Sequence, residues 1–127
     1  MTDLLKTCLE DSFVLAYCDC ALWASTDDDD TPLDKHHGLD SFHHDTLAAM
    51  YADCRRFMEQ AGDIDDERPD AWGQAGHDFW LTRNGHGAGF WDGDWPVSGD
   101  RLTELSSTFG EFDLCIGEDG LIHGHKG

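Results

Sequence analysis

The carboxylates of this chain outnumber its cationic side chains by more than three to one, with 27 Asp and Glu against 8 Lys and Arg in 127 residues. An ionised carboxylate that is buried without a partner is very costly, so nearly all of these groups must lie on the surface. Apolar residues make up 39% of the chain and include 7 Phe and 5 Trp, which is enough to build a core. The sequence therefore predicts one folded domain over residues 1–127 with a strongly anionic exterior.

The formal net charge of −19 also limits what the protein binds. Such a surface repels nucleic acid and anionic membranes, and it accelerates encounters with basic partners. We therefore expect a basic protein as partner, and no direct binding of nucleic acid or membrane. Solubility or adaptation to a high-salt cytoplasm is the alternative explanation of the charge, since only three lysines occur, Lys6, Lys35 and Lys126.

The five cysteines are odd in number, and the N-terminal residues do not have the pattern of a signal peptide. Free thiols in a reducing compartment are the simplest explanation. No apolar run approaches the roughly 20 residues that cross a bilayer. The sequence therefore predicts a soluble cytoplasmic protein.

Three segments have apolar residues at the three- and four-residue spacing of amphipathic helices. The first is residues 12–24, and its pattern extends back toward Asp3. The second is residues 43–61, with Asp40 or Ser41 as its N-cap and Gly62 as its terminator. The third is the short segment 100–109, capped by Ser98 or Gly99 and stopped by Gly110. We expect Cys20 and Cys54 in the core, because both fall on apolar stripes.

Two acidic loops separate these helices, at about 25–40 and 62–76. The first contains four adjacent aspartates followed by Pro32, which prevents continuation of a helix. The second contains five carboxylates around Pro69. Neither loop has a periodic apolar pattern.

Four segments have strand composition, and they predict two β-hairpins. The first hairpin pairs 77–83 with 89–92 through the Asn-Gly dipeptide at 84–85, and the second pairs 112–116 with 121–123 through the Asp-Gly dipeptide at 119–120. Residues 124–127 are expected to fray. The predicted fold class is α+β, with two longer helices and one short helix packed on an antiparallel sheet of two β-hairpins.

Three stretches resemble a family of small bacteriophage and prophage proteins. They read WASTDDD at 23–29, HDFWLTRNGHGAGFWD at 77–92 and FDLCIGEDG at 112–120. This chain departs from the family pattern in its doubled histidines and at Gly93, where an Arg is common. The family has no established activity, so the resemblance implies a phage origin and no catalytic residues. It also implies a functional class, because small acidic phage proteins often inhibit host DNA-binding defence proteins by imitating DNA phosphates.

The first hairpin predicts an exposed tip that makes polar contacts with a partner through Arg83, Asn84 and His86. Asp78 and Asp92 flank the aromatic residues of this hairpin, and the simplest role for either is to pair with Arg83 across it.

No motif around Cys115, in the second hairpin, supports a nucleophilic role for its thiol. The alternative to an exposed binding tip is that the aromatic residues of the first hairpin fill the core and its glycines only permit the turn.

The histidines form a cluster in the sequence at 36–37 and 43–44, but their spacing matches no familiar metal motif. We therefore predict solvated histidines, no metal, no cofactor and no catalytic residue. Two alternatives to a binding protein remain open. One is a metal-binding protein or small enzyme that uses the histidines and the central hairpin, and the other is a structural or regulatory phage protein whose acidity serves solubility.

The leading hypothesis is a phage-encoded inhibitor that imitates nucleic acid and binds a host nucleic-acid-binding defence protein of the restriction or CRISPR type. Its partner-binding carboxylates are expected in the two acidic loops, where they replace phosphates as acceptors from Arg and Lys. They are Asp27, Asp28, Asp29, Asp30 and Asp34 in the first loop, and Asp63, Asp65, Asp66, Glu67 and Asp70 in the second.

Overall fold

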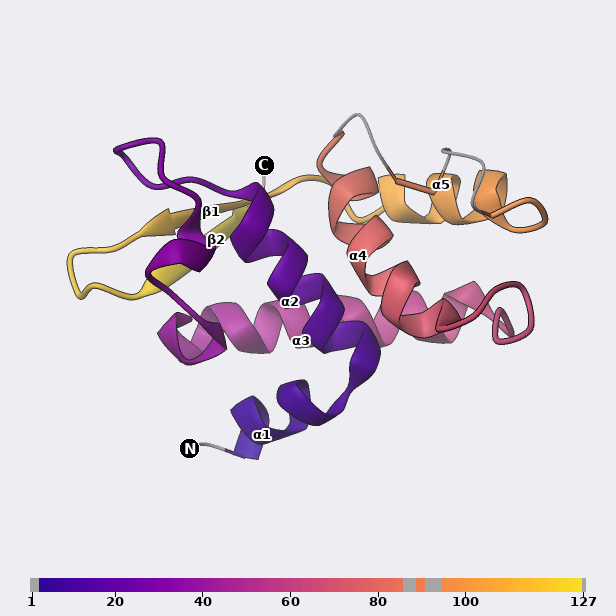
Figure 1. Cartoon of the computed structure of the whole chain (residues 1–127), viewed down its shortest axis with the longest axis horizontal. Coiled ribbons are helices and arrows are strands. Elements are labelled where there is room, and N and C mark those ends of the chain that lie inside the picture. The colour runs from indigo at the N-terminus through magenta and orange to yellow at the C-terminus, as the bar shows by residue number, and fades with distance from the viewer. Residues whose placement is uncertain (1–2, 86–88, 91–94, 127) are drawn as a thin grey trace.

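The structure is a computed structural model that describes residues 3–85, 89–90 and 95–126 (Figure 1). These residues contain five α-helices, two short 3₁₀ helices and one two-stranded antiparallel hairpin, so the fold is α+β but mostly helical. Among them, no helix is both long and apolar enough to cross a lipid bilayer. The elements in chain order are α1 (Asp3–Glu10), α2 (Ser12–Ala24), η1 (Leu33–Lys35), η2 (Leu39–Ser41), α3 (His44–Ala61), α4 (Ala71–Arg83), α5 (Gly99–Ser107), β1 (Phe112–Ile116) and β2 (Ile122–Lys126).

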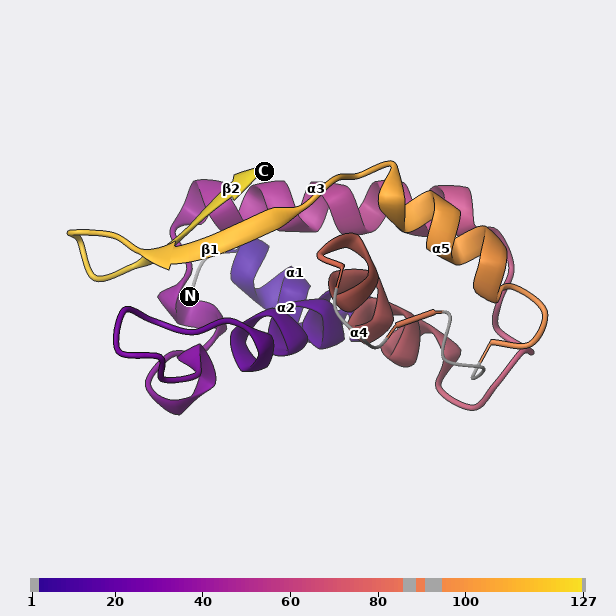
Figure 2. The same cartoon turned by 90° about the horizontal axis from the view of Figure 1, so that it is seen from above.

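The helix α3 runs along the long axis of the molecule (Figure 1). The view from above shows α3, the hairpin and α5 on one side and α2 and α4 on the other (Figure 2). Aromatic side chains fill the space between these two sides. The ring of Phe57 on α3 stacks on that of Phe79 on α4 with 4.3 Å between centroids, and Tyr17 on α2 lies 5.2 Å from Phe79. The core therefore joins the three central helices.

The helix predicted over residues 12–24 is confirmed as α2, with the same bounds. Its N-cap is Asp11, whose carboxylate accepts hydrogen bonds from the backbone N–H groups of Phe13 and Val14 at 3.0 and 3.2 Å. Because Asp11 has extended backbone angles, the apolar pattern toward Asp3 forms a separate helix, α1, and does not lengthen α2.

The helix predicted over 43–61 is confirmed as α3, but its N-cap is His43, not Asp40 or Ser41. The Nδ1 atom of His43 accepts a hydrogen bond from the Asp45 N–H at 3.1 Å. The helix ends before Gly62, as predicted, at a positive φ of 74° that glycine adopts without strain.

The short helix predicted over 100–109 is confirmed as α5, with bounds Gly99–Ser107. Ser98 holds the predicted N-cap position, although its side chain makes no capping hydrogen bond.

The first predicted hairpin is wrong, because residues 77–83 belong to the helix α4. This helix is buried on nearly all sides, so it lacks the alternation of apolar and polar faces that marks a surface helix. A Cβ atom at Gly76 would lie 2.1 Å from the Phe13 carbonyl oxygen, so glycine permits the close approach of α2 and α4. The second acidic loop therefore ends at Asp70 and not at residue 76. The predicted partner strand, 89–92, lies partly outside the described residues.

The second predicted hairpin is confirmed, with β1 paired to β2 from Ile116 opposite Ile122 to Phe112 opposite Lys126. Gly120 has a φ of 79°, which suits the predicted Asp-Gly turn. The expected fraying is wrong for residues 124–126, because they pair with β1 and the Gly124 N–H also donates to Thr46 Oγ1 on α3 at 3.1 Å.

Candidate partner-binding site

The first acidic loop is organised by the carboxylate of Asp27. This carboxylate accepts hydrogen bonds from the backbone N–H groups of Asp29 and Thr31 at 2.8 and 3.0 Å. A β-bridge between Thr26 and Pro32 closes the loop at its base. Asp27 therefore has a structural role and is half-buried, whereas the four other predicted carboxylates of this loop are exposed, namely Asp28, Asp29, Asp30 and Asp34.

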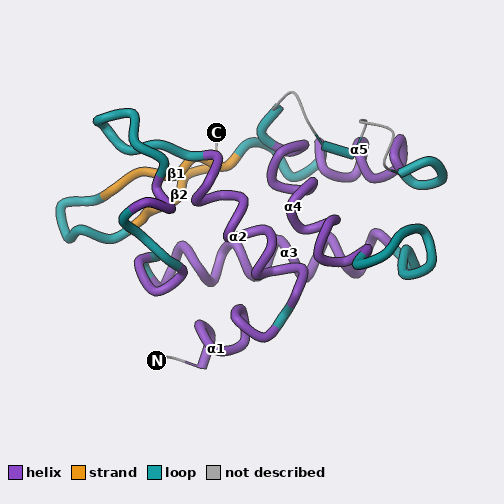
Figure 3. Tube along the Cα trace, in the orientation of Figure 1, coloured by secondary structure: helices purple, strands orange, loops and turns teal. Residues whose placement is uncertain are grey.

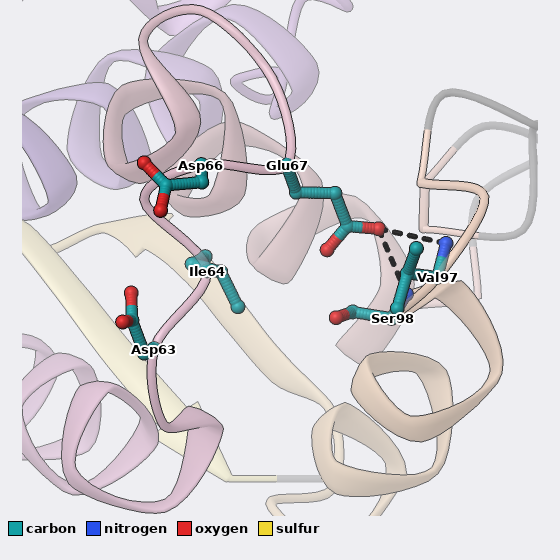
Figure 4. Close-up of a pocket in the computed structure, with 6 residues that line it drawn as sticks. All are labelled: Asp63, Ile64, Asp66, Glu67, Val97 and Ser98. Carbon is teal, nitrogen blue, oxygen red and sulfur yellow. Dashed lines mark hydrogen bonds between the residues drawn. The ribbon is translucent and has the colours of Figure 1, made fainter.

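The second acidic loop, residues 62–70, is fastened to the N-terminus of α5 by Glu67 (Figure 4). One carboxylate oxygen of Glu67 accepts hydrogen bonds from the backbone N–H groups of Val97 and Ser98, at 2.9 and 2.8 Å. The guanidinium of Arg101 on α5 donates to the Ala61 carbonyl at the end of α3. The loop is therefore held at both of its ends.

The contacts of Glu67 lower the pKa of its carboxyl group. Burial by itself would raise the pKa of Glu67, but hydrogen bonds from Ser98 and Val97, with the nearby Arg101 guanidinium, lower it below its ordinary value of 4.5. Glu67 therefore stays ionised at neutral pH and acts as a side-chain acceptor for the first N–H groups near α5.

A shallow hollow of about 300 Å³ lies between this loop and α5. Figure 4 shows the side chains of Asp63 and Asp66 set apart from the Glu67 contacts. Val97, on the opposite side of the hollow, is 85% exposed. The hollow thus presents carboxylates beside an apolar side chain, which is a surface that suits the charged head and aliphatic stem of Arg or Lys. Its lining residues are Asp63, Ile64, Asp66, Glu67, Val97 and Ser98.

The two remaining predicted carboxylates of the second loop differ in their contacts. The indole N–H of Trp72 donates to Asp65. Asp70 is exposed and sits immediately before α4 with a positive φ of 51°, and its side chain makes no capping hydrogen bond.

The two acidic loops lie at opposite ends of the molecule. The first projects beside the hairpin, and the second projects beyond α4 next to the start of α5 (Figures 1 and 3). The structure therefore does not bring the predicted carboxylates together in one patch. They form two separate anionic ends.

The cations of the chain compensate carboxylates elsewhere. The carboxylate of Asp53 on α3 lies 2.9 Å from the guanidinium of Arg83, 3.5 Å from that of Arg56 and 3.7 Å from the ammonium of Lys126. Arg55 lies 3.9 Å from the Asp11 carboxylate. The ion pairs of Lys and Arg with described carboxylates involve Asp53 and Asp11, and none of them involves the exposed loop residues Asp28, Asp29, Asp30, Asp63 or Asp66.

The predicted exposed tip is wrong for Arg83, which is 3% exposed on α4. Its guanidinium donates to Asp53 and to the Tyr17 hydroxyl, both at 2.9 Å, and to the carbonyls of Phe109 and Gly110. It joins α2, α3, α4 and the segment before β1. The suggested pairing of Arg83 with Asp78 is also wrong, because the Asp78 carboxylate accepts from the Trp95 indole at 2.7 Å.

Asn84 ties the end of α4 to the start of β1. Its side-chain oxygen accepts from the Phe112 N–H at 2.8 Å, and its amide donates to the Trp80 carbonyl at 3.0 Å. Asn84 therefore has structural contacts of its own. His86 and Asp92 lie outside the described residues.

The buried carboxylates of Asp53 and Asp78 were not predicted, and both are less than 5% exposed. Asp53 lies three residues after Met50 and four before Phe57, two residues of the buried stripe of α3. A carboxylate on the buried stripe of a helix indicates a buried ion pair, so the spacing of Asp53 could have predicted this one. Asp78 gave no comparable signal, because α4 has no periodic pattern.

Two histidines stack on each other at the hairpin end. The rings of His43 and His123 stack with 4.8 Å between centroids, and the His123 Nε2 atom lies 3.0 Å from both oxygens of Asp119. Hydrogen bonds from the Leu121 N–H and from His123 lower the pKa of Asp119. No three His, Cys, Asp or Glu side chains in the described part of the chain come together in a way that would hold a metal ion.

Cys20 and Cys54 are buried, as predicted, and so are Cys8 and Cys18. Cys115 is exposed on β1, with its Sγ atom 3.5 Å from the Nε2 atom of His125.

We compared the chain with protein-family models, with curated proteins and with solved structures, and none of them matches it.

Proposed function

We propose that this protein is an anionic binding protein that docks on a nucleic-acid-binding surface of another protein and inhibits it by occupying the place of the phosphates. The observation that carries the proposal is the excess of exposed carboxylates in the two acidic loops, whose sequences contain Lys35 and Arg68 as their only Lys or Arg residues. Several of the chain's few cations pair instead with Asp53 and Asp11. The resemblance to small phage proteins suggests a host defence protein of the restriction or CRISPR type as that partner.

The geometry of the loops supports such a role. Asp27 accepts hydrogen bonds from the backbone of its own loop, and Glu67 fastens its loop to the Val97 and Ser98 N–H groups, so the neighbouring carboxylates are presented on an ordered backbone. A preorganised loop loses less conformational entropy on binding. Exposed carboxylates then accept charge-assisted hydrogen bonds from Arg and Lys, as phosphate oxygens do.

The position of the loops defines the shape of the proposed contact. Because they lie at opposite ends of the molecule, the protein engages either two separate basic surfaces or one long basic groove (Figure 1). Val97 adds an apolar contact at one end only, where it lies beside Asp63 and Asp66. That end is therefore the better candidate for recognition of a particular partner, since charge alone discriminates poorly.

The test is affinity capture of host proteins by the purified protein at low and high salt, followed by elution with duplex DNA. A loop variant replaces five exposed carboxylates by their amides. A control variant makes the same number of neutralisations on exposed carboxylates outside the loops, and so has the same net charge. The loop variant changes Asp28, Asp29, Asp30, Asp63 and Asp66, and the control changes Glu10, Glu59, Glu104, Asp113 and Glu118.

We expect the wild-type protein and the control to retain a basic partner at low salt, and DNA or high salt to release it. Binding through several phosphate-like contacts falls by orders of magnitude between about 50 and 200 mM salt. The loop variant should retain roughly tenfold less partner. Retention that does not respond to salt, or equal retention by the two variants, would contradict the proposal. Equal retention would instead favour acidity that serves solubility.

A further inference from the structure

A groove of about 370 Å³ lies on the surface between α1, α2 and the segment 37–40. Its walls are mainly leucines, which come from three different elements. Leu9 on α1 is 40% exposed. The groove is distinct from both acidic loops. It is lined by Leu5 and Leu9 of α1, by Leu15, Asp19 and Leu22 of α2, and by residues 37–40.

The α2 wall of the groove has one carboxylate between two leucines. Leu15, Asp19 and Leu22 are spaced by four and three residues, so they follow one another along a single face of the helix. Leu5 and Leu9 have the same four-residue spacing on α1. The groove is therefore mainly apolar, with an acidic group between the two leucines of one wall.

Two carboxylates, those of Asp19 and Asp40, line this groove. Partial burial raises the pKa of Asp19, because the leucines around it displace water that would solvate its charge. Asp40 is exposed and lines the groove from the 37–40 segment, next to His37 and Gly38. Among the described residues, neither carboxylate forms an ion pair with a Lys or Arg. A cation brought by another molecule would compensate both.

We propose that this groove binds an amphipathic, basic helix of the partner protein. Apolar side chains of that helix, at positions i, i+3 or i+4 and i+7, contact the leucines, and Lys or Arg side chains that border its apolar stripe pair with Asp19 and Asp40. A second copy of this chain does not fit as the occupant, because two molecules of net charge −19 repel each other. The inference rests on the proposed function, since it assumes a cationic partner, and it specifies which part of that partner is recognised.

The test uses two labelled synthetic peptides built from the same Leu, Ala and Lys residues. One places the leucines on a single face of a helix, and the other is a scramble with the same charge and no apolar face. Fluorescence anisotropy measures binding to the wild-type protein and to four variants. Leu9→Gln and Asp19→Asn change the groove, and Trp23→Gln and Glu104→Gln are the controls at exposed positions that do not line it. Circular dichroism and urea midpoints check that each variant folds.

We expect the amphipathic peptide to bind roughly tenfold more tightly than the scramble, because only it can fill the leucine-lined walls. Leu9→Gln and Asp19→Asn should each reduce that difference several-fold, and the two controls should leave it unchanged. Asp19→Asn removes a charge and no volume, so it remains informative if Leu9→Gln impairs folding.

The possible failures are distinguishable. Equal binding of both peptides, abolished by the loop variant, would overturn the groove inference and leave the proposed function intact. Groove-dependent binding, without any salt-sensitive partner in the capture experiment, would preserve the groove and overturn the proposed function. Failure of the amphipathic peptide to bind at low salt would overturn the groove inference.

Discussion

At the scale of single residues, burial divides the cysteines into two classes. Cys8, Cys18, Cys20 and Cys54 are buried, and Cys115 is exposed. Burial raises the pKa of Cys8 to about 11 and that of Cys20 to about 12, because a buried thiolate is poorly solvated. At about pH 8 we therefore expect Ellman's reagent to label one thiol rapidly in the folded protein and all five in denaturant. Cys115→Ser should remove the rapid phase, and a second fast thiol in the folded protein would contradict this assignment.

Arg83 carries a second prediction at this scale. Its guanidinium is fully enclosed and compensates Asp53, so Arg83→Ala leaves a buried carboxylate with only its two exposed partners, Arg56 and Lys126. We expect the free energy of unfolding, measured by urea denaturation, to fall by about 3–5 kcal/mol. Arg55→Ala is the control, because the Arg55 pair with Asp11 is half-exposed and long, and its loss should cost less than about 1 kcal/mol. Similar costs for the two variants would mean that the Arg83 network contributes little.

At the scale of elements, Glu67 couples the second acidic loop to α5 in a pH-dependent way. Its pKa is lower in the folded protein than its ordinary value of 4.5, so the folded state favours the ionised form. The stabilisation is therefore fully present above about pH 4.5 and is lost as the pH falls through the folded-state pKa. We expect Glu67→Gln to destabilise the protein at pH 7 and to reduce the loss of stability between about pH 5 and pH 3, measured by thermal unfolding.

The matched control for this prediction is Glu104→Gln, an exposed change on the same helix that should leave the acid dependence as in the wild type. If Glu67→Gln and the wild type lose stability in parallel over that range, the contact between the loop and α5 does not contribute to stability.

At the scale of the whole molecule, the many carboxylates of the folded protein repel one another. A compact molecule of net charge −19 gains stability when salt screens its charges. We expect the urea midpoint to rise when NaCl increases from about 20 to about 500 mM. The rise should be smaller for the loop variant, which carries five fewer negative charges. A midpoint that falls with salt would show that the few ion pairs, above all those of Asp53, outweigh the repulsion.

The arrangement of carboxylates at this scale also decides how the protein meets its partner. The sequence predicted two acidic loops without placing them relative to each other, and in the structure they project from opposite ends of the molecule, with α3 running between them (Figure 1). The groove lined by leucines lies on α1 and α2, away from the hollow at α5. A partner that uses more than one of these surfaces must extend along a large part of the molecule.

The sequence predicted correctly the elements whose pattern depends only on residues close together in the chain. α3 has one buried and one solvated face, so its periodicity and the terminating Gly62 marked its extent, and α2 was marked by apolar residues at three- and four-residue spacing. The C-terminal hairpin was marked by its Asp-Gly turn. The acidic loops were recognised from like-charge runs beside proline, and these features do not depend on distant parts of the chain.

The tertiary structure alone decided the form of α4, the place of Arg83 and the separation of the two acidic loops. α4 packs against α2 and α5 and is buried on nearly all sides. Its sequence therefore lacks the amphipathic pattern by which a surface helix is identified. Arg83 is buried because Asp53, Tyr17 and the Phe109 carbonyl, all distant in sequence, satisfy its guanidinium. Such contacts depend on how helices cross in space, and no local pattern of residues contains that information.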